Sequence, residues 1–133
     1  VLGLEQLKRL DFNCEQRSKN FILWVNSLTE TKFRVDYEQN GNSNFALPLI
    51  LQEKDLELFR NCCRLLEEEE VEYRVGTAGG GNQARQPYLE GYDVIKHDLK
   101  NVDHIHEYGL YIGNHPELVD ENIVNLCEKL NSL

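Results

Sequence analysis

The sequence predicts an α+β fold: a small, mostly antiparallel sheet with helices packed on one face, preceded by a long linking helix. Apolar residues recur at helical spacing over several long segments, and short segments of strand type lie between them. Strands interleaved with helices of this length are typical of a layered fold around one core. We expect a single domain over residues 1–133, because this length suits one hydrophobic core.

The first predicted element is an amphipathic helix over residues 2–28, bent near residues 11–13, within a linking segment at residues 1–32. The apolar stripe of this helix is about four turns longer than the length that would cover a small sheet. The excess predicts a docking surface for a further domain or partner. The chain also contains no methionine, so we expect it to be part of a longer polypeptide. The apolar residues of the stripe are Leu4, Leu7, Leu10, Cys14, Phe21, Trp24 or Val25, and Leu28.

Two candidate strands follow this helix. Residues 33–37 alternate between apolar and polar types, and residues 45–51 form a nearly continuous apolar run. Pro48 has no N–H to donate, so the second strand is predicted at a sheet edge or with a bulge. The later predicted elements are a helix over 53–70, a strand over 71–75, a long loop over 76–97, a helix over 101–108 capped by Asn101, a strand over 109–113, and a helix over 116–133 with the core face Ile123, Leu126 or Cys127, Leu130 and Leu133.

The charge balance argues against a nucleic-acid partner. Acidic residues number 23 against 14 basic ones, for a net charge of −9, and no basic stripe offsets them. No apolar run approaches the roughly 18 residues that a membrane span needs, and no segment resembles a signal peptide. We therefore expect a cytoplasmic protein that contacts neither membrane nor nucleic acid.

The cysteines and histidines predict no metal site. His104 and His106 are two positions apart on a predicted helix, which places them on different faces and excludes a helical metal pair. The cysteines are interpreted as small buried apolar residues. None of the four forms a CxxC pair: Cys14, Cys62, Cys63 and Cys127.

The glycine-rich loop after residue 75 carries a chemically informative set of polar residues. A loop of about twenty residues inside a compact domain is uncommon, and such loops are usually functional or disordered. Glycines let the backbone approach a ligand closely, and arginines bind phosphate or carboxylate groups through two N–H donors. The residues leave two alternatives open: disorder at 79–81, or an anion- or sugar-contacting loop that uses Arg74, Asn82 and Arg85.

His115 is a further candidate, at the end of the last predicted strand. Its imidazole is suited to act as a general base or a ligand-binding group, and equally to satisfy a backbone carbonyl in a tight turn. Both interpretations stay open. No Ser/His/Asp or Cys/His arrangement is recognisable in the sequence.

Several motifs occur in the order and spacing of one known family. Residues 3–7 read G-L-E-Q-L, then Leu10-Asp11 follows, and Arg17 and Asn20 have the spacing R-x-x-N. Residues 71–87 form a strand and loop ending in Q-P, and residues 109–123 form a last strand and helix start. Over essentially the whole chain, this order resembles the C-terminal small domain of the StrS/DegT-type sugar aminotransferases and dehydratases. These belong to the fold-type-I pyridoxal phosphate (PLP) enzymes.

This resemblance implies an enzyme that depends on PLP or pyridoxamine phosphate (PMP) and acts on nucleotide-linked 4-keto-6-deoxy sugars for cell-surface polysaccharides such as lipopolysaccharide. Residues 81–87 read G-N-Q-A-R-Q-P. This is similar to the 3-dehydratase branch, which uses PMP to remove the C3 hydroxyl, whereas the aminotransferases tend to carry histidine before the Q-P. The residues implied to bind substrate, by positioning it and neutralising its charge, are Arg74, Asn82, Arg85 and His115.

The resemblance also implies that the chemistry lies elsewhere in the parent protein. The lysine that forms the internal Schiff base, or the histidine replacing it in dehydratases, belongs to a missing N-terminal large domain, and the parent is a homodimer. Lys96 is the nearest lookalike in this chain, but the glycine-rich segment that should follow it is absent. Two other interpretations remain: a stand-alone ligand-binding or interaction domain without catalysis, and a degenerate enzyme.

Overall fold

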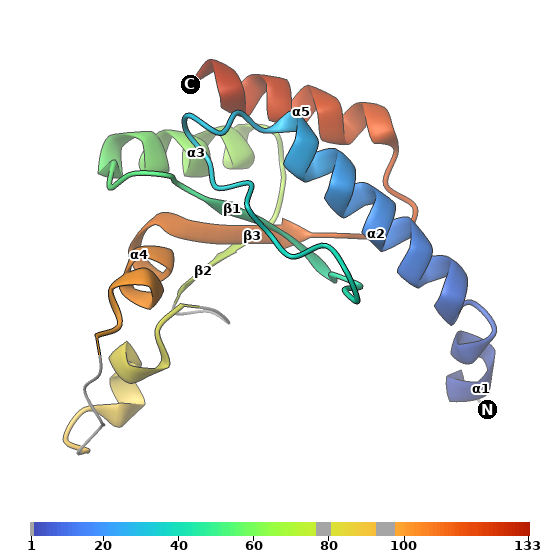
Figure 1. The fold of residues 1–133 in the computed structure, drawn as a ribbon, viewed down its shortest axis with the longest axis horizontal. Helices are drawn as coiled ribbons and strands as arrows, with labels where there is room; N and C mark the ends of the chain where they lie inside the picture. The colour runs from blue at the N-terminus through green and yellow to red at the C-terminus, as the bar shows by residue number, and fades with distance from the viewer. Residues whose placement is uncertain (1, 77–80, 93–97) are drawn as a thin grey trace.

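The computed structural model describes residues 2–76, 81–92 and 98–133, and it confirms the α+β architecture (Figure 1). Three strands form one antiparallel sheet in the order β1-β3-β2. Helices α2, α3 and α5 lie together on one side of this sheet in Figure 1. The elements are α1 (Leu2–Leu7), α2 (Leu10–Ser27), β1 (Ala46–Ile50), α3 (Leu56–Glu68), β2 (Tyr73–Val75), α4 (Lys100–Tyr108), β3 (Gly109–Gly113) and α5 (Asp120–Ser132).

The sheet has one apolar face and one open face. In the antiparallel register, Leu47 lies opposite Ile112 and Leu49 opposite Leu110, and all four are buried. Because successive side chains alternate between the faces of a strand, the neighbouring positions Pro48, Arg74 and Tyr111 share the opposite face. The buried face packs against residues from the three helices: Phe21, Trp24, Val25, Cys62, Leu66, Ile123, Cys127 and Leu130.

Pro48 explains why the predicted strand over residues 33–37 did not form. Only one isolated bridge occurs there, between Phe33 and Leu51, with Arg34 donating its backbone N–H to the Ile50 carbonyl at 2.8 Å. Farther along the same edge, Pro48 has no N–H to donate, and its carbonyl accepts a hydrogen bond from Trp24 Nε1 at 2.7 Å, so a longer ladder has no partner there. The strand prediction was therefore wrong, whereas the edge position predicted for Pro48 is confirmed.

The predicted linking helix is two helices that break earlier than expected. The break falls at Lys8 and Arg9, where Arg9 donates its N–H to the Gln6 carbonyl in a tighter turn at 3.1 Å, rather than at residues 11–13. Burial on α2 begins only at Asn20. Figure 1 shows α1 and the first turns of α2 extending away from the sheet. The apolar side chains of this extension remain exposed: Leu2, Leu4, Leu7, Leu10 and Phe12.

The other helices differ from the predictions only at their ends. Asp55 caps α3, its carboxylate accepting the Leu58 N–H at 2.9 Å. The predicted cap at Asn101 was wrong, because α4 begins at Lys100 and Asn101 lies inside it. On α5, Ile123, Cys127 and Leu130 are buried as predicted, but Leu133 is 40% exposed at the chain's last position.

No described helix has both the length and the apolar character to cross a membrane.

We expect Cys62 and Cys127 to resist alkylation until the domain unfolds. Burial raises the pKa of each thiol to about 12, and only the thiolate reacts. At neutral pH they should react at least roughly tenfold more slowly than the half-buried Cys14, as read by mass spectrometry after timed alkylation with and without urea. Equal rates at Cys14 and Cys127 in the folded chain would contradict this assignment.

The same shift predicts the alkaline behaviour of stability. A thiol pKa raised by folding adds stability that is complete below the ordinary thiol pKa of about 8.5 and is lost as the pH rises toward 12. The free energy of unfolding should therefore decrease as the pH is raised from about 8.5 to about 12.

Candidate functional site

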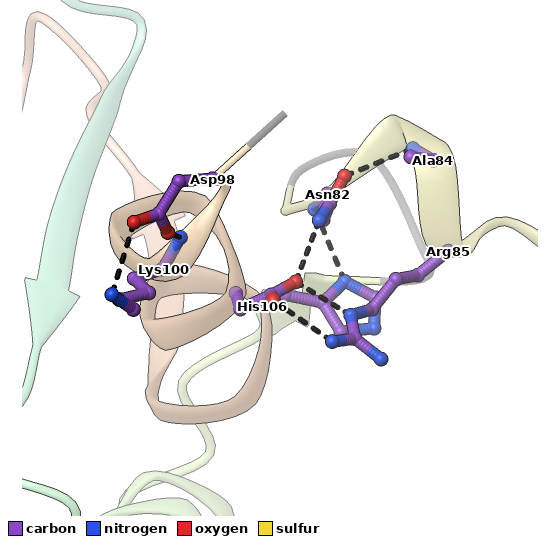
Figure 2. Close-up of polar contacts among 7 residues, drawn as sticks. Asn82, Ala84, Arg85, Asp98, Lys100 and His106 are labelled. Carbon is purple, nitrogen blue, oxygen red and sulfur yellow. Dashed lines mark hydrogen bonds and ion pairs between the residues drawn. The ribbon is translucent and has the colours of Figure 1, made fainter. Parts of the chain in front are cut away.

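The structure brings two of the sequence-predicted site residues, Asn82 and Arg85, together on one carboxylate. Arg85 donates from Nε to Asp103 Oδ1 at 2.5 Å and from Nη2 to Oδ2 at 2.8 Å. Asn82 Nδ2 donates to the same Oδ1 at 2.6 Å, and the Asn82 backbone N–H donates to His106 Nδ1 at 3.2 Å. Figure 2 shows these contacts between the loop and α4. We call these four residues, Asn82, Arg85, Asp103 and His106, the Asp103 clip.

Local structure on both sides positions the clip. Asp103 and His106 are one turn apart on α4, so their side chains leave the same face of the helix. On the loop side, Asn82 Oδ1 accepts the Ala84 N–H at 2.9 Å and starts the 3-10 helix Gln83–Arg85. Asn82 is 3% exposed, which is unusual for a loop residue and follows from its use of both amide atoms and its backbone N–H.

Two glycines allow the loop backbone to pass against His106. A Cβ on Gly76 would lie 2.7 Å from both the Nδ1 and the backbone oxygen of His106. A Cβ on Gly81 would lie 2.5 Å from His106 Nδ1, and Gly81 has a φ of +75°, which L side chains rarely adopt. Gly76 is therefore required for space, and Gly81 for both space and conformation.

The clip fixes the charge state of its carboxylate. Hydrogen bonds from Arg85 and then from Asn82 hold the pKa of Asp103 well below its usual range. Because the pKa of this carboxyl is lower in the folded chain than in the unfolded chain, the stabilisation is present at pH values above the unfolded-state pKa. It is lost as the pH falls through the folded-state pKa. The Arg85 side chain is 52% exposed, so the clip presents a cation to solvent.

The other two predicted residues, Arg74 and His115, lie apart from the clip. Arg74 forms an ion pair with Glu72 at 2.5 Å and lines a shallow hollow on the open face of the sheet beside Phe45 and Tyr111. Exposed His115 accepts the Glu117 N–H on Nδ1 at 3.2 Å, so it satisfies a backbone group in a tight turn. The sequence interpretation had a backbone carbonyl as the partner of this ring, whereas the structure shows a backbone N–H in that place.

The sequence interpretation missed both α4 partners of the clip. Asp103 and His106 are separated by three positions on a predicted helix, and this spacing was the available signal. The loop positions 77–80 and the lookalike Lys96 lie outside the described residues.

Asn114 was also missed, and its contacts explain the R-x-x-N motif. Its side chain accepts a hydrogen bond from Asn20 at 3.0 Å and donates to the carbonyls of Arg17 and Asn44 at 3.0 and 2.8 Å. Asn20 also donates to the His115 carbonyl, and Arg17 Nε donates to the Asn114 carbonyl. The R-x-x-N spacing on α2 therefore holds the end of β3 in place.

The described residues do not themselves fit PLP. None of their lysines is buried, and four of them are paired with carboxylates: Lys8, Lys19, Lys100 and Lys129. Nor do three or more of the described His, Cys, Asp and Glu residues gather as potential metal ligands.

The sequence profile of the DegT/DnrJ/EryC1/StrS aminotransferase family matches residues 1–131. The chain belongs to this family. GDP-4-keto-6-deoxy-D-mannose 3-dehydratase of Yersinia pseudotuberculosis is 28% identical over 128 residues, which cover 95% of this chain and 32% of that protein. Lipopolysaccharide biosynthesis protein RfbH of Salmonella typhimurium is 29% identical over 133 residues, covering 96% and 30% respectively. The chain thus spans about a third of the length of the curated relatives it matches.

Solved structures with this fold include two enzymes. The E. coli GDP-4-keto-6-deoxy-D-mannose-3-dehydratase with bound hydrated PLP superposes with a TM-score of 0.80 at 23% identity, over 96% of this chain and 33% of that one. A GDP-4-keto-6-deoxymannose-3-dehydratase with a trapped PLP-glutamate geminal diamine gives 0.82 at 24% identity, with the same coverage. The fold resemblance therefore covers nearly the whole of this chain but one part of each enzyme.

Proposed function

We propose that this chain is the C-terminal small domain, residues 1–133, of a cytoplasmic PLP- or PMP-dependent enzyme acting on a nucleotide-linked 4-keto-6-deoxy sugar. The observation that carries the proposal is the family match over residues 1–131, together with relatives about three times as long whose names specify GDP-sugar dehydration and lipopolysaccharide biosynthesis. The cofactor and the groups that react with it then belong to a large domain preceding this chain, in a homodimeric parent.

The exposed apolar extension of α1 and α2 supports this division of labour. Leu2, Leu4 and Leu7 are 83%, 68% and 62% exposed, and Leu10 and Phe12 continue the patch along α2. Isolated exposed leucines are ordinary, but five apolar side chains along one projecting helical segment are typical of an interface. In the proposed parent, the large domain covers this patch and fixes the small domain at the edge of the active site.

The role proposed for this domain is to bind and orient substrate on one wall of the active site. Arg85 and Arg74 neutralise phosphate charge, Asn82 orders the loop, and His115 lies at the same end of β3 as the Asn114 network. PLP or PMP, when bound, supplies the electron sink for the sugar chemistry. These residues contribute positioning and electrostatic stabilisation without moving a proton.

A chimera tests the proposal. The chain replaces the C-terminal third of the Yersinia pseudotuberculosis dehydratase, and turnover of that enzyme's substrate is measured with added cofactor. We expect turnover above that of the truncated large domain alone, and an Arg85→Gln change should raise KM about tenfold with a smaller effect on kcat. Arg60→Gln, at an exposed position on α3, is the matched control and should leave both constants unchanged.

A chimera that is folded and cofactor-loaded, yet no more active than the truncated large domain, would refute the proposal. The isolated chain, incubated with cofactor and dialysed, should retain none of the cofactor's absorbance. Retention that borohydride reduction makes permanent would show that the chain itself carries the Schiff-base lysine.

A further inference from the structure

We infer that Asp103 and His106 are positioning residues, which hold one edge of the Arg85 guanidinium so that its other edge is presented to a diphosphate. This inference rests on the proposed function and deepens it, because it places the substrate's diphosphate at the Arg85 guanidinium. Neither residue was expected to take part in binding, and neither needs to touch the ligand.

The geometry of the ion pair carries the first step. A guanidinium has five N–H donors arranged along two edges, one formed by Nε and Nη2 and the other by Nη1 and Nη2. Asp103 takes one hydrogen from Nε and one from Nη2, at 2.5 and 2.8 Å. Both contacts therefore use the same edge of the group, the one formed by Nε and Nη2. Three hydrogens therefore remain, and no other described residue bonds Nη1. Two of them, one on Nη1 and one on Nη2, lie on the outer edge and match two oxygens of a phosphate.

The second step is that the carboxylate is itself held. Asn82 Nδ2 donates to Asp103 Oδ1 at 2.6 Å, so three donors from two residues converge on one carboxylate. Asn82 is 3% exposed and its own oxygen is occupied by Ala84 N–H. A group fixed in this way restricts rotation of the arginine about its long side chain, which lowers the entropy lost when an anion binds.

The third step places His106 beneath the loop backbone. Its Nδ1 accepts the Asn82 N–H at 3.2 Å, which requires the neutral ring with its proton on Nε2. The backbone at Gly76 and Gly81 lies so close to this ring that a Cβ at either position would collide with Nδ1. The His106 ring therefore fixes the distance between the loop backbone and α4, whereas Asp103 fixes the orientation of the Arg85 guanidinium.

The opposing effect is the negative charge of Asp103, which repels an anion as well as orienting the arginine. The pair is exposed, with side-chain exposures of 52% for Arg85 and 28% for Asp103, so water screens this repulsion. The hydrogen bonds to the outer edge are short-ranged and depend on orientation. We therefore expect orientation to outweigh repulsion, so that loss of the carboxylate weakens binding.

The test is a titration of the isotope-labelled 133-residue chain with inorganic pyrophosphate, followed by NMR at the Arg85 Nε–H and the Asn82 amide. We expect perturbation centred on Arg85, and Asp103→Asn should weaken the apparent Kd roughly tenfold and speed solvent exchange of the Nε–H. Asp103→Glu, which keeps the carboxylate, should recover part of the affinity. Asp98→Asn is the matched control, since it removes the same charge from an exposed pair with Lys100 outside the clip.

Each alternative result overturns the inference in a recognisable way. Unchanged or tighter binding by Asp103→Asn would make Asp103 a competitor for Arg85, and perturbation away from Arg85 would place the anion elsewhere. An Nε–H that exchanges equally fast in the wild type and in Asp103→Asn would show that the arginine is not held. If the chimera is inactive but pyrophosphate binding still depends on Asp103, the proposed enzyme activity is refuted and the positioning role of Asp103 is retained.

Discussion

Asn114→Ala is expected to lower the free energy of unfolding by about 3 kcal/mol, because it removes three hydrogen bonds made by a buried side chain. The lost bonds are one from the Asn20 amide and one to each of the carbonyls of Arg17 and Asn44. Asn20 and Asn114 are both 2% exposed, so water does not replace these partners without structural change. Urea unfolding can be followed through Trp24, the only tryptophan, which is fully buried.

The matched control is Asn125→Ala. Asn125 is exposed on α5, so its replacement should change stability by only a few tenths of a kcal/mol, in the stabilising direction, since alanine is the better helix former. A loss below about 1 kcal/mol for Asn114→Ala would contradict the role of the Asn114 network, because it would mean that the three groups find other partners.

Local patterns predicted those elements whose formation depends on local properties. The strand over 109–113 was predicted at its observed bounds, because an apolar run bounded by glycines needs little information from elsewhere. The helix α3 was predicted from its stripe, but it begins after the Asp55 cap and ends at Glu68, two residues before the predicted end. The layered α+β fold follows once these elements must bury their apolar faces together.

Long-range contacts decided the elements that were predicted wrongly. Residues 33–37 have the pattern of a strand, but the pairing stops at the Phe33–Leu51 bridge, and farther along that edge Pro48 has no N–H and its carbonyl is taken by the Trp24 side chain. Nothing within the segment indicates that its partner strand offers no further hydrogen bonds. A pattern predicts that a segment can pair, but the partner strand decides how far the pairing extends.

The candidate site shows the same division between residue type and geometry. Asn82 and Arg85 were identified because their types bind anions, and the structure places both on Asp103. Arg74 has the same type but projects from the open face of the sheet, where it pairs with Glu72. Chemical type therefore identified three residues as candidates, and only the fold could group two of them with α4.

Gly81→Ala is expected to open the Asp103 clip and to weaken pyrophosphate binding at Arg85 by roughly tenfold or more. The new Cβ would lie 2.5 Å from His106 Nδ1 and 2.9 Å from Gly76 Cα, on a residue whose φ is +75°. The left-handed conformation alone costs about 1–2 kcal/mol, and the collision adds to it, so the backbone at Asn82 must move away from His106. Faster hydrogen exchange of the Asn82 amide and of the Arg85 Nε–H would report this opening.

Two further glycines separate the collision from the backbone strain. Gly91 has a φ of +90° with nothing within 4 Å of its Cβ position, so Gly91→Ala carries the strain without the collision and should leave the clip closed. Gly76→Ala adds no left-handed strain but meets the Nδ1 and backbone oxygen of His106 at 2.7 Å, so it should open the clip as Gly81→Ala does. If Gly91→Ala weakened pyrophosphate binding as much as Gly81→Ala, loop stiffness in general would be responsible. The close approach to His106 would then have no specific part in holding Arg85.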